Sequence, residues 1–452
     1  MTNIPKLFGT SGIRGEYQKD VTPELALDVA RALAKYIGGC GKKVVLGRDT
    51  RTSGKILENI MSAGLQECGC DVLLLGMVPT PTVGYATLKK GADAGIMITA
   101  SHNPSKYNGI KLWNADGLAY KQNQEREIER IVYEQDFEKV GWDKVGKEYD
   151  ITPFKDEYVD DIIKVSGINP EKTLKVVVDC ASGAGSELSP EALRRAGMEV
   201  ITLNAQPDGF FPGRNPEPNS ANLQELMKTV KVLGADVGLA HDGDADRMIA
   251  IDEKGNISDF DKLLTVIAKE FGGTVVTTVD ASACLDTEMK KLGGKVLRTP
   301  VGDVHVAESI NENNATFGGE PSGTWLHPDF CMCPDGLLSG LRIVRCIQKN
   351  GKLSEQLDAI ESYPTIREKI TCSNDTQESV MKTVEKSFVD EFNDVEEVLT
   401  IDGVRLSFTD GSWVLVRPSG TEPYVRITAE GKTQEHLDKI NEVSTKFLEK
   451  HI

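Results

Sequence analysis

A serine in a short loop is the first side chain of this sequence that could carry chemistry. Ser101 lies in the segment Thr-Ala-Ser-His-Asn-Pro, which directly follows the apolar run Ala94–Ile98. Reactive groups in α/β sheets gather just beyond the carboxyl ends of strands, and the Asn-Pro pair favours a turn that presents the hydroxyl. Lys111, ten residues later, is a candidate proton carrier and on spacing alone equally a surface cation. A lone loop serine is more often only a turn residue, so the other segments must decide.

Three aspartates at alternate positions form the second candidate site. Asp242, Asp244 and Asp246 lie between the apolar runs Val237–Ala240 and Met248–Ile251. Carboxylates so close together repel one another and disfavour burial unless a hard cation compensates them. The pattern therefore predicts a magnesium site.

Two other interpretations of this acidic segment are weaker. A calcium-binding EF-hand loop would place Glu253 twelfth, but its sixth position holds Arg247 instead of glycine, and the flanking runs are typical of strands. A solvated acidic turn is the remaining alternative, and the apolar runs on both sides make it less favourable than metal binding.

Two glycine-containing segments could bind a phosphosugar. The segment that begins at Arg417 contains Ser419, Gly420 and Thr421. Its guanidinium, hydroxyls and backbone amides are the donors that a phosphate dianion requires. A second segment contains Glu320, Ser322 and Gly323, and it could present a carboxylate and a hydroxyl to sugar hydroxyls. Taken singly, each segment is equally well explained as a tight turn.

A glycine-rich segment near the start, Phe8–Gly15, surrounds Arg14 and is compatible with close approach of the backbone to an anion. It lacks the Gly-Lys-Ser/Thr of a nucleotide-binding phosphate loop, and no clear strand precedes it as a dinucleotide fingerprint requires. Nucleotide binding is therefore not supported.

The elements that position these residues follow an α/β cadence. Short apolar runs, glycine or aspartate turns and helix-like stretches alternate, with clear runs at 43–49, 175–180 and 274–280. Such a cadence predicts α/β layers with largely parallel strands, and the similar spacing of the three runs suggests three similar units. After about residue 364 the pattern changes to strands at 398–401, 404–408, 413–417 and 424–429 and a helix at 434–450, which predicts a smaller α+β domain.

We expect four domains that pack against one another and leave clefts between them, since no low-complexity linker separates them. The expected domains are 1–150 with the serine loop, 151–253 with the aspartate loop, 254–363 with the Glu320 segment, and 364–452 with the Arg417 segment.

Composition excludes several classes of function. The 69 acidic and 52 basic residues give a net charge of −17, which would repel a nucleic-acid backbone. No apolar stretch is long enough to span a membrane and no targeting leader is apparent.

Nine cysteines, an odd number, do not indicate a disulfide framework. The pairs Cys68-Gly-Cys70 and Cys331-Met-Cys333 are too closely spaced for zinc and favour buried thiols. We expect a cytoplasmic protein.

Taken together, and in this order, the five segments resemble those of the α-D-phosphohexomutase family, which includes phosphoglucosamine mutases, phosphomannomutases and phosphoglucomutases. The resemblance runs from Phe8 to Arg426. It implies a heart-shaped enzyme in which three similar α/β domains and a smaller C-terminal domain surround a central cleft. It also implies a phosphosugar substrate, Mg²⁺, a hexose 1,6-bisphosphate intermediate or activator, and a monomer or homodimer.

The resemblance also assigns roles to residues. Ser101 would carry the phosphoryl group and, with Asp242, Asp244 and Asp246, hold the magnesium ion. The residues that would move protons or support charge are Lys111, as general acid/base, with His102, Arg14 and Arg247. The residues that would bind the sugar hydroxyls and the non-reacting phosphate are Glu320, Ser322 and Gly323, and Arg417, Ser419, Gly420 and Thr421. Phosphoryl transfer depends mainly on alignment and charge neutralisation, which these residue types can supply.

One departure from the family pattern concerns the sugar segment. Many members have histidine directly after Gly-Glu-x-Ser-Gly, whereas this chain has Thr324, and Pro321 stiffens the segment. The Arg14 and Arg417 segments are closest to the phosphoglucosamine mutase branch, so glucosamine 6-phosphate and glucosamine 1-phosphate are the expected substrates. The alternatives are a dual-specificity phosphomannomutase/phosphoglucomutase, more remotely a phosphopentomutase, and outside this activity a non-catalytic phosphosugar-binding protein or a serine hydrolase that uses His102.

Overall fold

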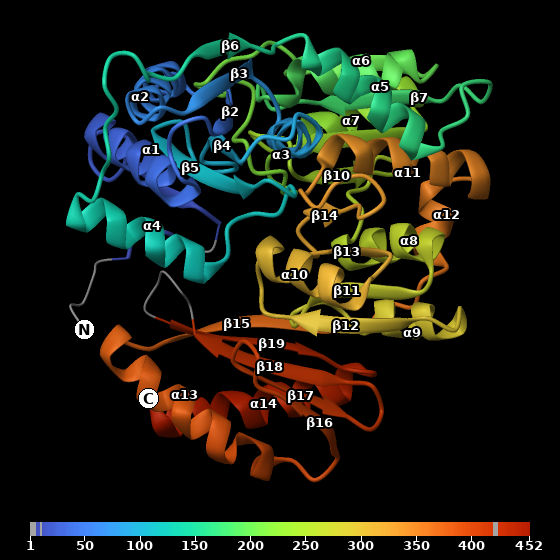
Figure 1. Ribbon diagram of the computed structural model, residues 1–452. Helices are drawn as coiled ribbons and strands as arrows, with labels where there is room; N and C mark the ends of the chain where they lie inside the picture. The colour runs from blue at the N-terminus through green and yellow to red at the C-terminus, as the bar shows by residue number, and fades with distance from the viewer. Residues whose placement is uncertain (1–5, 10, 419–423) are drawn as a thin grey trace.

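The computed structural model describes residues 6–9, 11–418 and 424–452. Figure 1 shows four domains, each built on one sheet and following one another in colour from blue to red. The expected α/β architecture with a smaller α+β domain at the end is confirmed.

The first domain carries a six-stranded sheet in the order β1-β5-β4-β2-β3-β6. Helix α1 begins where the Thr22 hydroxyl accepts from Leu25 N at 3.1 Å, and it ends at Gly38 in the left-handed conformation. The elements are β1 (Ile13–Glu16), α1 (Pro23–Ile37), β2 (Lys43–Arg48), α2 (Gly54–Glu67), β3 (Asp71–Met77), α3 (Thr80–Lys89), β4 (Ala94–Ile98), β5 (Tyr107–Asn114), α4 (Gln122–Glu134) and β6 (Glu148–Asp150).

The second and third domains each carry a four-stranded sheet, in the orders β10-β9-β7-β8 and β12-β11-β13-β14. The elements of the second are α5 (Phe154–Ser166), β7 (Lys175–Asp179), α6 (Gly185–Arg195), β8 (Glu199–Leu203), α7 (Gln224–Leu233), β9 (Val237–His241) and β10 (Met248–Ile251). The elements in the stretch of chain that holds the third sheet are α8 (Phe260–Phe271), β11 (Thr274–Thr278), α9 (Cys284–Lys291), β12 (Lys295–Thr299), α10 (Asp303–Asn313), β13 (Phe317–Gly319), β14 (Trp325–Leu326), α11 (Gly336–Asn350) and α12 (Leu353–Asp358).

A common unit of four strands recurs in these three sheets. In each, a central strand (β2, β7 or β11) pairs in parallel with two neighbours, and one of these neighbours pairs with an antiparallel strand (β5, β10 or β14). The central strands are the three apolar runs that the sequence singled out. The suggested repeat is therefore present at the level of topology.

The fourth domain has a five-stranded antiparallel sheet in the order β15-β19-β18-β17-β16, covered by helices. The strands predicted at 404–408, 413–417 and 424–429 and the final helix are present with shifts of at most one residue, whereas the strand predicted at 398–401 lies at 395–399. Its elements are β15 (Thr365–Thr371), α13 (Asn374–Ser387), the short 3₁₀ helix η1 (Phe388–Glu391), β16 (Val395–Leu399), β17 (Val404–Phe408), β18 (Trp413–Pro418), β19 (Tyr424–Glu430) and α14 (Gln434–His451).

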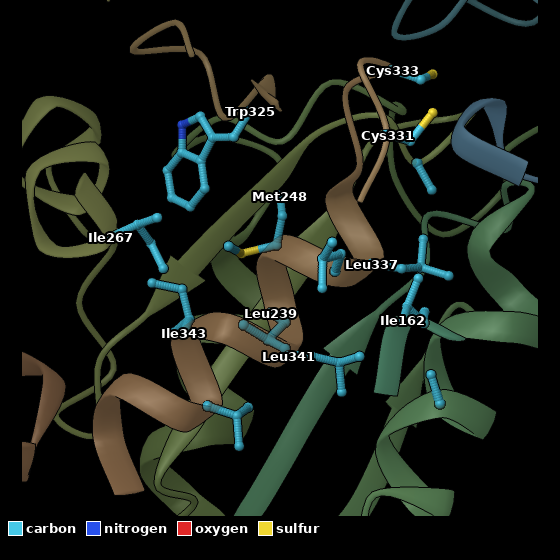
Figure 2. Close-up of a cluster of buried hydrophobic side chains, with 14 of the residues drawn as sticks. Ile162, Leu239, Met248, Ile267, Trp325, Cys331, Cys333, Leu337, Leu341 and Ile343 are labelled. Atoms are coloured by element: carbon cyan, nitrogen blue, oxygen red, sulfur yellow. The ribbon is translucent and has the colours of Figure 1, made fainter. Parts of the chain in front are cut away.

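Helix α11 joins the second and third domains. It follows the third sheet in sequence but packs against α5, α6 and β10 of the second domain. Figure 2 shows Leu337 and Leu341 of this helix beside Leu239, Met248 and Ile162, and all five are buried. The same hydrophobic cluster continues into the first and third domains, so the three α/β domains share one continuous core.

The cysteines behave as the composition predicts. All nine are free thiols, and Cys68, Cys70, Cys331 and Cys333 are buried. Within the part of the chain that the structure describes, no helix is long and apolar enough to cross a membrane.

Candidate active site

The Ser101 loop leaves the carboxyl end of β4 and holds its serine in an uncommon conformation. Ser101 has a φ of 50°, in the left-handed region that non-glycine residues rarely adopt. Its hydroxyl donates to Asp242 Oδ2 at 2.8 Å and lies 3.2 Å from His102 Nδ1. The structure therefore joins the serine loop of the first domain directly to the aspartate loop of the second.

A buried arginine fixes the shape of this loop. Arg51 donates from Nη2 to the carbonyls of Ser101 and Asn103, at 2.9 and 2.7 Å. Its Nη1 donates to the carbonyls of Pro104 in the loop and of Tyr107 at the start of β5, and its Nε pairs with Asp49 Oδ2 at 3.0 Å. Asp49 also accepts from Thr99, whose hydroxyl in turn accepts from the Ser101 amide.

Sequence reasoning missed Asp49 and Arg51. The available signal was a pair of charged residues directly after the apolar strand β2, the same kind of position that identified Ser101. Both side chains are fully buried, and a charge pair is retained in such a place only when nearly every donor and acceptor is satisfied. Here Arg51 donates mainly to backbone carbonyls of the Ser101 loop.

The aspartate loop connects β9 to β10 and touches the serine loop through a glycine. A Cβ atom on Gly243 would lie 2.5 Å from the Ser101 carbonyl oxygen, so only glycine permits this approach. Asp244 Oδ2 accepts from the Thr80 hydroxyl at 2.5 Å and from Lys111 Nζ at 3.0 Å. Lys111 also donates to Asp246 Oδ2, at 2.6 Å.

The three aspartates form a group that could hold a metal ion. They are buried, and one ligand atom from each lies within 4.8 Å of the others. Asp244 Oδ1 and Asp246 Oδ1 are buried without a hydrogen-bond partner among the described residues. Unsatisfied carboxylate oxygens in such a cluster are hard donors, which fit Mg²⁺ or Ca²⁺ better than softer ions.

The titration behaviour of the cluster follows from burial and mutual repulsion. Burial raises the pKa of Asp242 well above its ordinary value, and the charges of Asp246 and Asp244 add to this effect. Burial also acts to raise the pKa of Asp244, but the ammonium of Lys111 and the Thr80 hydroxyl outweigh it and the net pKa is lowered. For Lys111 burial acts to lower the pKa, but Asp244 and Asp246 outweigh it and the net pKa is raised.

A cavity of about 190 Å³ lies beside this cluster and receives side chains from three domains. Its lining residues are Ser11, Arg14, His102, Asp246, Arg247, Val301, Gly302, Asp303, Glu320 and Thr324. The buried Nε atoms of Arg14 and Arg247 have no partner among the described residues, so donors remain for an anionic ligand. Arg14 belongs to the edge strand β1, not to a loop, and its Nη1 lies 3.5 Å from Asn103 Oδ1.

His102 is a neutral imidazole in this setting. Burial lowers its pKa to about 3, and the charges of Arg247 and Arg14 contribute further. Among the contacts within the described chain, no carboxylate hydrogen-bonds to its ring. A Ser-His-Asp triad needs such a carboxylate to orient the histidine, so the geometry does not support a serine hydrolase.

The segment that contains Glu320, Ser322 and Gly323 contacts the aspartate loop through its backbone. Met248 N donates to Gly323 O at 3.0 Å, next to the antiparallel bridge between Arg247 and Thr324. Glu320 and Thr324 line the cavity. The Ser322 hydroxyl lies 3.1 Å from the Thr324 hydroxyl and 3.4 Å from Glu320 Oε2.

Arg417 lies in the fourth domain, at the end of β18. Its guanidinium pairs with Asp402 at 3.3 Å, and Asp402 also accepts from Val301 N of the third domain at 3.1 Å. Because Val301 lines the cavity, this chain of contacts connects Arg417 to the site. The other predicted residues of this segment, Ser419, Gly420 and Thr421, lie outside the described residues.

Comparison with known proteins agrees with this arrangement. Models of the phosphoglucomutase/phosphomannomutase alpha/beta/alpha domains I, II and III match residues 5–139, 156–255 and 259–363, and the model of the C-terminal domain matches residues 369–444.

Named relatives cover nearly the whole chain. A Methanosphaera stadtmanae protein described as "Probable phosphoglucosamine mutase" is 80% identical over 99% of both chains. A "Phosphoglucosamine mutase" of Methanococcus maripaludis is 46% identical over 96% of both. The crystal structure of a phosphoglucomutase/phosphomannomutase family protein from Burkholderia thailandensis aligns with a TM-score of 0.89 at 28% identity, over 98% of this chain and 97% of that one. The chain therefore belongs to the phosphoglucomutase/phosphomannomutase family.

Proposed function

We propose that this protein interconverts glucosamine 6-phosphate and glucosamine 1-phosphate by intramolecular phosphoryl transfer, which makes it an isomerase. The observation that carries the proposal is the position of the Ser101 hydroxyl, 2.8 Å from Asp242 and next to a cavity lined by arginines. The choice of sugar is supported by the relatives described as phosphoglucosamine mutases, which are 46–80% identical over nearly the full chain.

In the proposed cycle Ser101 carries the phosphoryl group. The P–O bond to Ser101 breaks as a P–O bond forms to the free sugar hydroxyl. The proton of that hydroxyl passes to a base while the Ser101 oxygen takes up a proton, and these proton movements are reversed in the return transfer. The resulting hexose 1,6-bisphosphate turns around, and its other phosphoryl group is transferred to Ser101. One phosphate thus leaves with the product, and the phosphoserine is restored.

The side chains around Ser101 orient the transfer and support its charge. Lys111, held by Asp244 and Asp246, is the proposed proton carrier. Arg14 and Arg247 face the same cavity with Nε atoms that no other described residue binds, and they are proposed to bind the transferring phosphoryl oxygens. His102, neutral and beside the Ser101 hydroxyl, donates or accepts a hydrogen bond without adding charge.

The proposed ligands of a Mg²⁺ ion are Ser101, Asp242, Asp244 and Asp246. When bound, such an ion neutralises charge that develops on the transferring phosphoryl group. The unsatisfied Asp244 and Asp246 oxygens are the donors available for it.

The substrate is proposed to be held at both ends. Glu320 and Ser322 would bind sugar hydroxyls, with Gly323 providing the tight turn. Arg417, with Ser419, Gly420 and Thr421, would grip the phosphate that is not reacting. The connection of Arg417 to the cavity through Asp402 and Val301 supports this assignment.

Parallel assays with the phosphates of glucosamine, glucose and mannose test the proposal. The wild-type protein should show its highest kcat/KM with glucosamine phosphate, and removal of divalent cations by a chelator should abolish turnover until Mg²⁺ is restored. Ser101→Ala should lose nearly all activity, and mass spectrometry should locate a phosphate on Ser101 in the wild type alone. A preference for mannose or glucose phosphate would contradict the sugar, and an active Ser101→Ala enzyme would contradict the mechanism.

A further inference from the structure

Of the three carboxylates that line the cavity, Asp303 alone has no role in the proposed cycle. Asp303 is the first residue of α10, lines the cavity together with Glu320, and is only 9% exposed. It forms no hydrogen bond and no ion pair within the described part of the chain. Its carboxylate therefore faces the cavity without a protein donor, and a ligand that supplies one would be bound with a gain in free energy.

The surroundings of Asp303 show why a ligand donor is the natural partner. Burial raises the pKa of Asp303, although the charge of Lys111 opposes this effect. Burial also raises the pKa of Glu320, to about 8, and the charge of Asp303 contributes. Two partly uncompensated carboxyl groups therefore face one small cavity, and each disfavours ionisation of the other. A positively charged or amine group in the cavity would relieve both.

The neighbouring cations do not already satisfy Asp303. Arg14, Lys111 and Arg247 are close enough to influence its titration, but none forms an ion pair with it among the described residues. The Lys111 ammonium is instead held by Asp244 and Asp246. The carboxylate of Asp303 therefore offsets part of the positive charge of Arg14 and Arg247 without pairing with either, and it is free to accept from a ligand amine.

We propose that Asp303 receives the amino group of the substrate and is the residue that selects amino sugars over their hydroxyl analogues. The inference rests on the proposed function, because it assumes a glucosamine phosphate in the cavity. A protonated amine gives a carboxylate a charge-assisted hydrogen bond, which is stronger than the bond that a neutral hydroxyl can donate at the same place. Glucose phosphate, with a neutral hydroxyl at that position, would gain less from this carboxylate.

The test is the substrate preference of Asp303→Asn. Asparagine keeps the size of the side chain and is tolerated at a helix start, so the fold should be retained. The kcat/KM for glucosamine 6-phosphate should fall about 10- to 100-fold, as expected for the loss of a hydrogen bond to a charged group, while that for glucose 6-phosphate changes less than about 3-fold. Asp303→Ser, which is also favourable near a helix N-terminus, provides a second variant that should shift the preference in the same direction.

Glu125→Gln is the matched control. Glu125 lies in a neighbouring small cavity outside the sugar site, and its own titration senses the charge of Asp303, so the change removes one carboxylate from the same region. It should leave the preference unchanged. Equal losses with both sugars in the Asp303 variants would overturn this inference and leave the proposed function intact. A wild-type enzyme that prefers glucose or mannose phosphate would overturn the inference together with the proposed sugar.

Discussion

At the scale of single residues, the conformation of Ser101 needs support from its surroundings. A non-glycine residue in the left-handed region costs on the order of 1–3 kcal/mol in an active-site loop. Arg51 donates to three carbonyls of this loop and to that of Tyr107, where β5 begins, and the same guanidinium pairs with Asp49. We infer that the Asp49–Arg51 pair positions the serine without touching the reacting atoms.

Arg51→Lys tests this positioning role. A lysine ammonium lacks the planar fork of donors, so it would leave loop carbonyls and part of Asp49 unpaired. We expect kcat/KM to fall about 100-fold from misplacement of Ser101, and unfolding to become easier by roughly 2–4 kcal/mol. Steady-state kinetics and chemical denaturation measure the two effects.

Arg48→Lys is the control for this substitution. Arg48 is partly exposed and pairs with Glu58 at 3.3 Å, so lysine can retain that contact. It should change activity less than about 3-fold. If Arg51→Lys retained wild-type kinetics, the loop would not depend on the fork of donors.

The residue-scale predictions from sequence were best where chemistry is concentrated in a few consecutive positions. Ser101 and the three aspartates stood out because an apolar strand precedes a reactive group, and the structure brings them together. Arg51 and Asp303 did not stand out, because their significance lies in what surrounds them in space. Sequence spacing does not show that a side chain is buried without a partner or shared among four carbonyls.

At the scale of elements, helix α11 depends on a buried aspartate at its start. Asp335 Oδ1 accepts from Leu338 N at 2.9 Å, and the Tyr158 hydroxyl donates to Oδ2 at 2.9 Å. Burial raises the pKa of Asp335 to about 6, although these hydrogen bonds act to lower it. The folded protein therefore holds a proton on Asp335 more tightly than the unfolded chain does, whose aspartates have a pKa near ~4.

This shift gives a pH dependence of known sign. Between about pH 4 and pH 6 the folded state binds more protons at Asp335 than the unfolded state, so its contribution to stability falls as pH rises and is level above about pH 6. Asp335→Asn keeps an acceptor for Leu338 N and cannot titrate. The stability of the wild type relative to this variant should decline by up to about 3 kcal/mol over that interval.

Thermal or urea unfolding of the two proteins at matched pH values measures this difference. Asp259→Asn, a change at the more exposed N-cap of α8, is the control and should show no comparable decline. Parallel pH profiles for wild type and Asp335→Asn would contradict the assigned cause.

Most helices and strands could be predicted from the sequence, but the packing of α11 against the second domain could not. Apolar runs located the central strands β2, β7 and β11, and the strand pattern after residue 364 located β17, β18 and β19 but not β15. The short strand β6 fell in a polar stretch that the pattern assigned to a boundary. The attachment of α11 to the second domain was also hidden, because an amphipathic helix shows that one face is buried and not which sheet covers it.

At the scale of the whole molecule, the phosphate contact proposed for Arg417 requires that the fourth domain be held against the third. Glu430 Oε1 accepts from Ala283 N of the third domain at 2.9 Å and from Trp413 Nε1 at 3.0 Å. The Arg405 guanidinium stacks on Trp413 at 3.8 Å and donates to carbonyls that follow β11. These contacts join the carboxyl edge of the third sheet to the sheet of the fourth domain, which Figure 1 shows directly below it.

Glu430→Ala tests whether this docking sets the affinity for substrate. Without the carboxylate, Ala283 N and the indole N–H lose their buried acceptor, and the orientation of the fourth domain becomes less restricted. Leaving buried donors unsatisfied costs about 1–3 kcal/mol, so both monophosphates should bind about 5- to 100-fold more weakly. Calorimetric titration of glucosamine 1-phosphate and glucosamine 6-phosphate, in a Ser101→Ala background that cannot turn over, measures this directly.

Glu430→Gln separates docking from charge. A glutamine oxygen can occupy the place of Oε1 and accept both hydrogen bonds, so this variant should bind both ligands within about 3-fold of the parent. Because one arginine is proposed to grip the non-reacting phosphate whichever end of the sugar faces Ser101, the alanine variant should weaken the two ligands to a similar degree. Loss of affinity for only one monophosphate would mean that the bound sugar uses a different anchor in each orientation. Equal losses in the alanine and glutamine variants would mean that the negative charge of Glu430, and not the docking of the fourth domain, controls binding.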